Sequence, residues 1–154
     1  MYVADRSKVT KETSTGVQTG VAHAVGIVGL CAMALIHFVD VFGKWHETTY
    51  IAVLFLVLIA GSLVASGLLL TGNGRAGWAL GGLLAGLTLI CYIVSRTWGL
   101  PGSHNDVGNW TEPLGAASMF VEGVIVVMSA TLLIAGSRRS SSANESADLA
   151  PSLA

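Results

Sequence analysis

The chain has 154 residues, of which 53% are hydrophobic and 11% are charged, and its formal net charge is -1. A charged fraction this far below the ~25% of soluble domains excludes water as the main solvent. No polar stretch is long enough to bury a core of its own, so we expect an integral membrane protein whose principal partner is the lipid bilayer. The small net charge gives no reason to expect nucleic acid as a partner.

Four apolar stretches are long enough to cross a hydrocarbon layer of ~30 Å, which takes about 20 residues in a helix. They cover residues 16–42, 50–71, 76–97 and 113–136. A single charged residue, Glu122, interrupts the fourth stretch. The sequence therefore predicts an all-α fold with four transmembrane helices.

The connections between these stretches are short, so consecutive helices must run antiparallel as an up-down-up-down four-helix bundle. The polar segments 1–15 and 137–154 flank the transmembrane domain of residues 16–136. Their composition predicts a disordered lead and a disordered tail, both on the same side of the membrane.

The distribution of positive charge predicts the orientation, because Lys and Arg stay on the cytoplasmic side. Two of the eight basic residues, Lys44 and Arg96, fall at the end of the bundle away from the termini. The other six lie on the side of the termini: Arg6, Lys8, Lys11, Arg75, Arg138 and Arg139. We therefore predict a multi-pass protein of the bacterial inner (plasma) membrane with both termini in the cytoplasm.

A cleaved signal peptide is an alternative interpretation of the first span. Ala32-Met33-Ala34 has small residues at the spacing of a cleavage site. The apolar run continues through Val39, which is longer than such peptides require. Cleavage would leave three spans and an amino terminus outside the cell.

Glu122 is the most informative single residue, because an ionisable group inside a span costs about 2.5 to 3.5 kcal/mol and usually has a partner or a function. His37 and Asp40 share one face of the first helix near its outer end, and Arg96 lies where the third helix ends. We predict an outward-facing proton or cation site of Glu122, His37, Asp40 and Arg96, which would make the protein a small transporter or sensor. The alternative is a protonated Glu122 that is hydrogen-bonded to Ser or Thr across a helix interface.

Histidines and carboxylates near the outer boundary also predict a divalent-metal site, since a carboxylate beside an imidazole can orient a metal ligand. Its candidate ligands are His37, His46, His104 and Asp106. The sequence contains no His-Glu-x-x-His or similar ligand spacing, and solvated imidazoles are the competing interpretation.

Two patterns point to a redox cofactor. His23 and His37 are fourteen residues apart on one helix, which resembles the paired haem ligands of b-type cytochromes. No second helix carries such a pair, so haem would require a partner or a second copy. The sulfur atoms of Cys31, Cys91, Met33, Met119 and Met128 would suit Cu(I), although such residues also serve simply in packing. Because neither pattern is complete, we expect the chain to work without a cofactor.

Small residues recur every fourth position, which allows helices to approach closely. The rows are Gly16/Gly20, Gly61/Ala65, Gly77/Gly81/Ala85 and Gly82/Gly86. No nucleophile elbow or phosphate loop is present in the sequence. We therefore predict a non-enzymatic subunit or accessory of a larger membrane assembly, in which these faces bind other membrane proteins or a second copy. Packing within the bundle is the alternative use of the rows.

The most distinctive segment runs from Ser95-Arg96-Thr97-Trp98-Gly99-Leu100-Pro101 to Glu112-Pro113-Leu114-Gly115. It resembles the Ser-Arg-Thr-x-Gly-Leu-Pro signature, followed by Glu-Pro-Leu/Val-Gly, of small membrane proteins of bacteria, especially actinobacteria. The likeness covers about a third of the chain. It implies a four-span architecture in a bacterial inner membrane and no particular activity. Arg96 can reach a carboxylate here, with Glu112, Asp40 or Glu122 as candidates.

Overall fold

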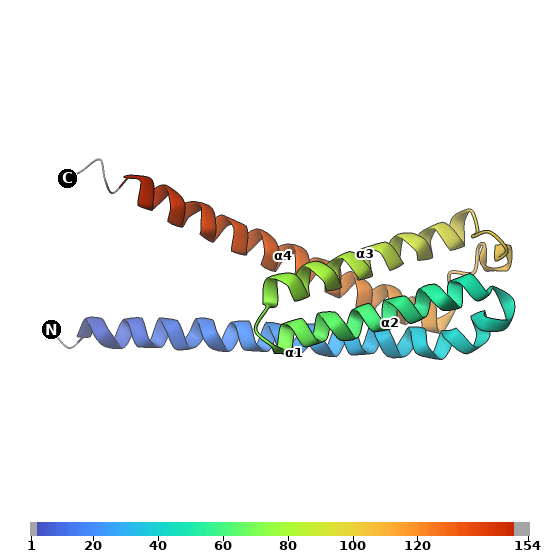
Figure 1. The fold of residues 1–154 in the computed structure, drawn as a ribbon, viewed down its shortest axis with the longest axis horizontal. Helices are drawn as coiled ribbons and strands as arrows, with labels where there is room; N and C mark the ends of the chain where they lie inside the picture. Colours follow the sequence, from blue (N-terminus) through green and yellow to red (C-terminus); the bar gives the residue numbers. More distant parts are fainter. Residues whose placement is uncertain (1–2, 150–154) are drawn as a thin grey trace.

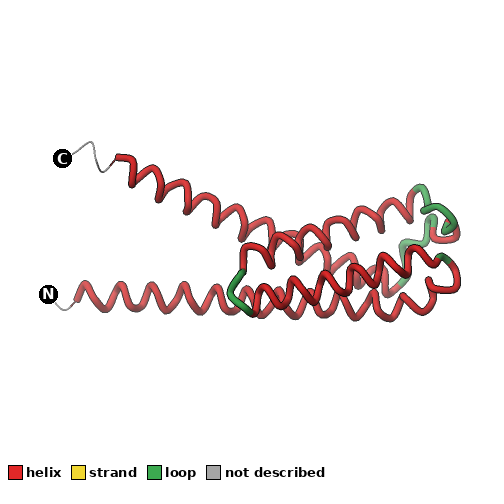
Figure 2. The backbone as a smooth tube through the Cα atoms, viewed as in Figure 1, coloured by secondary structure: helices red, strands yellow, loops and turns green. Residues whose placement is uncertain are grey.

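The computed structural model describes the backbone of residues 3–149 and the side chains of residues 16–138 and 141. Its long helices are α1 (Val3–Glu47), α2 (Thr49–Leu70), α3 (Gly74–Thr97) and α4 (Pro113–Leu149). A short 3-10 helix, η1 (His104–Asp106), lies in the connection between α3 and α4. Helices joined by short loops make up the whole described part of the chain (Figure 2). The predicted all-α fold is confirmed.

The four helices form an up-down-up-down bundle (Figure 1). The backbones of α1 and α3 each pack against α2 and α4, whereas α1 and α3 contact each other mainly through side chains. Both ends of the chain point to one end of the bundle, which we call the terminal end. The connection of residues 98–112 lies at the opposite end, which we call the loop end. Four antiparallel passes thus place the two termini on the same side.

Each helix contains a segment that can span a membrane. These segments are Gly16–Glu47, Thr49–Leu70, Gly74–Thr97 and Pro113–Arg138. Large apolar side chains cover the outside of the bundle, as at Leu70 and Phe120, which are 72% and 74% exposed. Such a surface is suited to lipid and would be costly in water. The chain is therefore a multi-pass integral membrane protein.

Glycine lets the helices approach closely at the terminal half of the bundle. A Cβ atom on Gly26 of α1 would lie 2.5 Å from the Trp78 ring of α3, and a Cβ on Gly82 would lie 2.6 Å from Cβ of Ser129 on α4. In the neighbouring row, a Cβ on Gly77 would lie 2.7 Å from Leu69 of α2. The two small-residue rows of α3 are therefore used inside the bundle, one toward α1 and α2 and the other toward α4.

The backbone of the polar ends continues the first and last helices, and the disorder expected at 1–15 and 137–154 stays a prediction from the sequence. The described parts of both ends are helical, since α1 begins at Val3 and α4 ends at Leu149. A helix that already exists extends at low cost, because each added residue gains a hydrogen bond without a new nucleus. Residues 3–15 and 137–149 contain no Gly or Pro that would stop this extension. Residues 1–2 and 150–154 lie outside the described part of the chain.

Candidate functional site

A histidine and a glutamate face each other inside the bundle. His37 of α1 and Glu122 of α4 are 4% and 1% exposed. The Nε2 atom of His37 lies 3.6 Å from Oε1 of Glu122. We call these two residues the membrane pair. They come from the first and last helices, so the bundle must be assembled before they can meet.

Each side chain of the pair is held by a hydrogen bond within its own helix. Nδ1 of His37 lies 2.9 Å from the carbonyl oxygen of Met33. A carbonyl can only accept, so Nδ1 carries a hydrogen and Nε2 is the nitrogen that faces Glu122. The hydroxyl of Ser118 donates to Oε1 of Glu122 at 2.5 Å. Phe55 of α2 meets the imidazole edge-on at 4.8 Å between ring centroids and closes a further side.

The membrane pair lies deep in the spanning region. Glu122 is nine residues from the start of α4 and His37 is ten residues from the end of α1. At 1.5 Å per residue, both lie about 14 Å from the loop end, which is near the middle of a ~30 Å hydrocarbon layer. An unpaired charge is costly at this depth, so the stable form of the pair has no net charge.

One shared proton gives this neutral form. The proton can reside on Glu122, leaving two uncharged side chains, or on Nε2 of His37, leaving an ion pair. Loss of the proton leaves a buried carboxylate with a net charge of -1, and a second proton creates an imidazolium with a net charge of +1. A change in the protonation of one group therefore changes the charge that faces the other.

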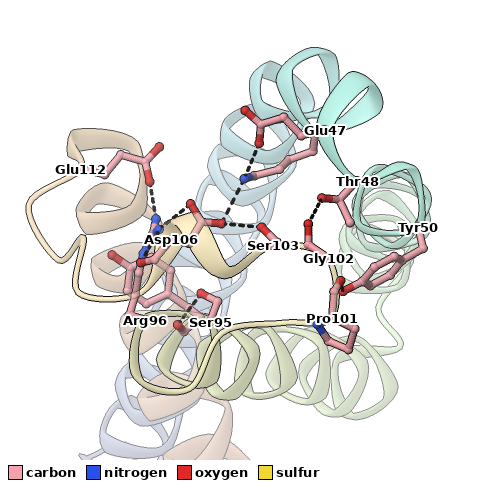
Figure 3. Close-up of polar contacts among 12 residues, drawn as sticks. Glu47, Thr48, Tyr50, Ser95, Arg96, Pro101, Gly102, Ser103, Asp106 and Glu112 are labelled. Atoms are coloured by element: carbon pink, nitrogen blue, oxygen red, sulfur yellow. Dashed lines mark hydrogen bonds and ion pairs between the residues drawn. The ribbon is translucent and has the colours of Figure 1, made fainter.

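A second group of charges lies at the loop end (Figure 3). Arg96, in the last turn of α3, is 2.9 Å from Oδ1 of Asp106 in η1 and also binds Glu112 just before α4. Lys44 of α1 donates to Oδ2 of Asp106 at 3.0 Å and to Glu47 at 2.9 Å. We call these five residues the loop-end network. Asp106 is its centre, since it joins the ends of α1 and α3 to the connecting loop.

Local contacts hold Asp106 in this central position. The hydroxyl of Ser103 donates to Oδ2 of Asp106 at 2.9 Å. Burial acts to raise the pKa of Asp106, but the hydrogen bonds from Lys44 and Ser103 and the charges of Lys44 and Arg96 outweigh it. The pKa of this carboxyl therefore lies below its ordinary value, and Asp106 is ionised at neutral pH.

Further hydrogen bonds fasten the loop to the helices. The hydroxyl of Tyr50 donates to the carbonyl of Pro101 at 2.8 Å, and the backbone N–H of Gly108 donates to the carbonyl of Arg96 at 2.9 Å. Gly108 adopts a φ of 80°, a left-handed conformation that favours glycine. The loop is therefore held against the ends of α2 and α3 (Figure 3).

The structure divides the predicted site of Glu122, His37, Asp40 and Arg96 between two places. Glu122 and His37 form the membrane pair, and Arg96 belongs to the loop-end network. Arg96 pairs with Glu112, one of the three carboxylates considered from the sequence, and also with Asp106. Asp40 is half-buried on α1 between the two groups. It forms no hydrogen bond or ion pair with any described residue, whereas the charges of both the network's acids and its bases act on it.

The predicted metal ligands are dispersed. His37 faces Glu122, Asp106 binds two bases, and His46 and His104 are exposed. Among the described residues, no three His, Cys, Asp or Glu side chains lie close enough together to hold a metal ion. The metal site stays a prediction from the sequence.

The candidate ligands for redox cofactors are also separated. The His23 ring lies beside Trp78 with 6.4 Å between centroids, while His37 is occupied by Met33 and Glu122. Cys31 and Cys91 are both free and exposed on the outer surface of the bundle. Met33, by contrast, is fully buried in the core. The haem and copper sites likewise stay predictions.

The sequence reasoning did not identify Ser118 or Lys44 as site residues. Ser118 lies four residues before Glu122, the spacing at which side chains on one helix face each other, and this signal was available in the sequence. Lys44 carries no such signal toward Asp106, which lies 62 residues away and is brought to it by the path of the loop. Ser103 lies only three residues before Asp106, within reach along the chain.

Comparisons with known proteins bring no further identification. No protein family, no curated protein and no solved structure matches this chain. The geometry of the membrane pair and the loop-end network therefore carries the functional argument.

Proposed function

We propose that this protein binds protons within the membrane and acts as a small sensor or transporter that responds to pH. The observation that carries this proposal is the burial of His37 and Glu122 against each other, at 3.6 Å, near the middle of the bilayer. A purely structural role would be filled at lower cost by apolar side chains of similar volume. An intramembrane acid next to an imidazole is suited to take up and release a proton near physiological pH.

The proposal includes an orientation. The loop end faces the outside and both termini face the cytoplasm of a bacterial inner membrane. The six basic residues on the terminal side support this arrangement, as does the likeness of the Ser95–Gly115 segment to four-span bacterial membrane proteins. The loop-end network would then be in contact with the external medium.

The alternative role, as a subunit or accessory of a larger assembly, has less support from the geometry. It was inferred from the small-residue rows, and both rows of α3 are filled by neighbours within the bundle. Gly16 and Gly20 of α1 are the exception, because nothing lies within 4 Å of a Cβ on either residue. The subunit role therefore stays a prediction.

Infrared titration of the protein in lipid nanodiscs tests the proposed function, because the carbonyl band of a protonated carboxyl disappears when the group ionises. The wild type should show one buried carboxyl band that changes with pH and is absent in Glu122→Gln. Glu47→Gln is the matched control, since Glu47 lies at the exposed end of α1. A spectrum in which Glu122→Gln removes no pH-dependent band would refute the proposal.

A further inference from the structure

The surroundings of the membrane pair differ strongly between its two sides. Toward the loop end, α1 carries Asp40 three residues and Lys44 seven residues after His37, all on one face of the helix. Lys44 is already part of the loop-end network. Ionisable side chains on one face of α1 thus lie between the network and His37, with a rise of about 4.5 Å from His37 to Asp40.

Toward the terminal end, the membrane pair meets the tightest part of the core. Met33 and Leu30 lie one and two turns further along α1 and are 0% and 1% exposed. Ile125, three residues beyond Glu122 on α4, is 2% exposed and lies against Gly29 of α1. These three side chains close the bundle directly behind the pair.

No helix provides a proton-carrying side chain behind this closure until the terminal boundary is reached. On α1, the next such group inside the bundle is His23, fourteen residues or about 21 Å away, because Cys31 faces outward. On α4 it is Arg138, sixteen residues from Glu122. α2 carries only Tyr50, at the loop end. The remaining titratable groups are on α3, namely Arg75 at the terminal boundary, exposed Cys91, and Tyr92 and Arg96 toward the loop end.

The hydroxyl groups in this region do not bridge the gap. Ser62 and Ser66 of α2 donate to the carbonyls of Leu58 and Ser62 on their own helix, at 2.7 and 2.9 Å. The Oγ atom of Ser129 on α4 has no hydrogen-bond partner among the described residues. A proton on the membrane pair therefore has a polar route on one side alone.

We infer that the membrane pair exchanges protons with the loop end only, through Asp40, so that the protein is a sensor of the medium at the loop end rather than a proton transporter. This inference rests on the proposed function. In the exchange step, the Asp40 carboxylate takes a proton from water at the loop end and becomes a carboxylic acid. It then passes this proton to the Nε2–Oε1 contact of the pair and returns to its ionised form. The net change is one proton gained by the pair and one lost by water.

Asp40 is suited to this relay because it is a carboxyl group without a fixed partner. The other acids nearby, Asp106 and Glu112, are each bound to a base and hold the loop in place. Asp40 can change its protonation state without breaking an ion pair.

The rate of proton uptake tests the relay. A light-triggered acid jump in nanodiscs, followed by the infrared band of Glu122, should show uptake slowed at least about tenfold by Asp40→Asn, as expected for loss of a positioned proton donor. The equilibrium titration of the band should remain close to that of the wild type. His46→Gln, at the exposed loop end of α1 and outside the loop-end network, should leave both the rate and the titration unchanged.

The outcomes separate this inference from the proposed function. If Glu122 shows no titration at all, the proposed function fails. If Glu122 titrates normally and Asp40→Asn takes up protons at the wild-type rate, the relay fails while the proposed function stands. A loss of the equilibrium titration in Asp40→Asn would assign Asp40 to the binding site itself and would likewise overturn the relay.

Proton flux across sealed liposomes tests the closure toward the terminal end. Liposomes that contain a pH-sensitive dye and the wild-type protein should lose an imposed pH gradient no faster than protein-free liposomes. A protein-dependent flux that Glu122→Gln abolishes would show access from both sides and would overturn the sensor assignment.

Discussion

Lys44 at the end of α1 and Asp106 in η1 are 62 residues apart in sequence and are joined by a 3.0 Å hydrogen bond between Nζ and Oδ2. Arg96 binds the other carboxylate oxygen of Asp106 at 2.9 Å, so a single side chain joins α1 to α3. The side chains of Arg96 and Lys44 are 6% and 22% exposed, so water screens their charges only in part. The loop-end network therefore contributes more to the stability of the fold than isolated surface ion pairs do.

Asp106 should make the stability of the protein sensitive to acid. Its carboxyl has a folded-state pKa below the ordinary value of 3.8. The ionised group therefore stabilises the fold above pH ~4, and this contribution is lost as the pH falls through the folded pKa. We expect Asp106→Asn to lower the free energy of unfolding by about 1 kcal/mol at neutral pH.

Thermal unfolding in nanodiscs between pH 7 and pH 3 measures this effect. The difference between wild type and Asp106→Asn should shrink as the pH falls below 4. Glu47→Gln, which removes a 66% exposed carboxylate bound to the same lysine, serves as the control and should change stability little. A constant difference at all pH values would show that Asp106 acts through its shape and not through its charge.

Gly82 and Gly86 belong to one row of α3 but should respond differently to the same substitution. A Cβ on Gly82 would lie 2.6 Å from Cβ of Ser129, whereas a Cβ on Gly86 would meet Val126 at an ordinary 3.9 Å. Gly82→Ala should force α3 and α4 apart and destabilise the fold by about 1–3 kcal/mol. Gly86→Ala should be neutral or slightly stabilising, because alanine favours the helix.

The comparison of thermal unfolding between these two variants removes the shared effect of helix propensity. Equal unfolding temperatures would mean that α4 does not pack as closely against Gly82 as the structure shows. The same measurement addresses the assembly hypothesis, since a row that bound another protein would tolerate Gly82→Ala in the isolated chain.

The four-helix bundle could be predicted from the sequence because it depends on properties of whole helices rather than of single side chains. Apolar length defines the four spans, and the short connections require antiparallel neighbours. Glu122 stands out from the sequence because a charge inside a span is costly wherever it lies. The four-helix fold and the importance of Glu122 can thus be predicted without knowing how each helix is rotated about its own axis.

The partners of these residues depend on helix rotation and loop path, which the sequence does not specify. The sequence allowed either His37 or Arg96 to lie beside Glu122, and in the packed bundle it is His37 that does so. Nor does the sequence specify that η1 places Asp106 between Lys44 and Arg96.

Arg96 should be irreplaceable by lysine. Its guanidinium binds Asp106 and Glu112 at the same time and lies 4.9 Å from the centroid of the Tyr92 ring. An ammonium group keeps the charge but cannot present donors to two carboxylates in one plane or stack on the ring. We expect Arg96→Lys to loosen residues 98–112 and to increase their rate of proteolytic cleavage at least about threefold, as for a loss near 0.7 kcal/mol in local opening.

Limited proteolysis of nanodisc samples, with the cut sites identified by mass spectrometry, measures this change. Arg138→Lys is a matched control, because Arg138 is exposed at the terminal end and far from the loop. Unchanged cleavage of Arg96→Lys within residues 98–112 would show that the backbone contacts of Pro101 and Gly108 suffice to hold the loop.

The proposed orientation predicts which end of the bundle is reached from outside the cell. Asn109 in the loop and Ser141 beyond the span of α4 are both exposed, so a cysteine at either position is available to a maleimide. Cys31 and Cys91 face the lipid and are replaced by serine in both test chains. In intact cells, a membrane-impermeant maleimide should label Asn109→Cys at once and Ser141→Cys only after lysis, because Lys and Arg hold the terminal end in the cytoplasm. Labelling of Ser141→Cys in intact cells, with Asn109→Cys protected, would reverse the orientation and expose the loop-end network to the cytoplasm instead.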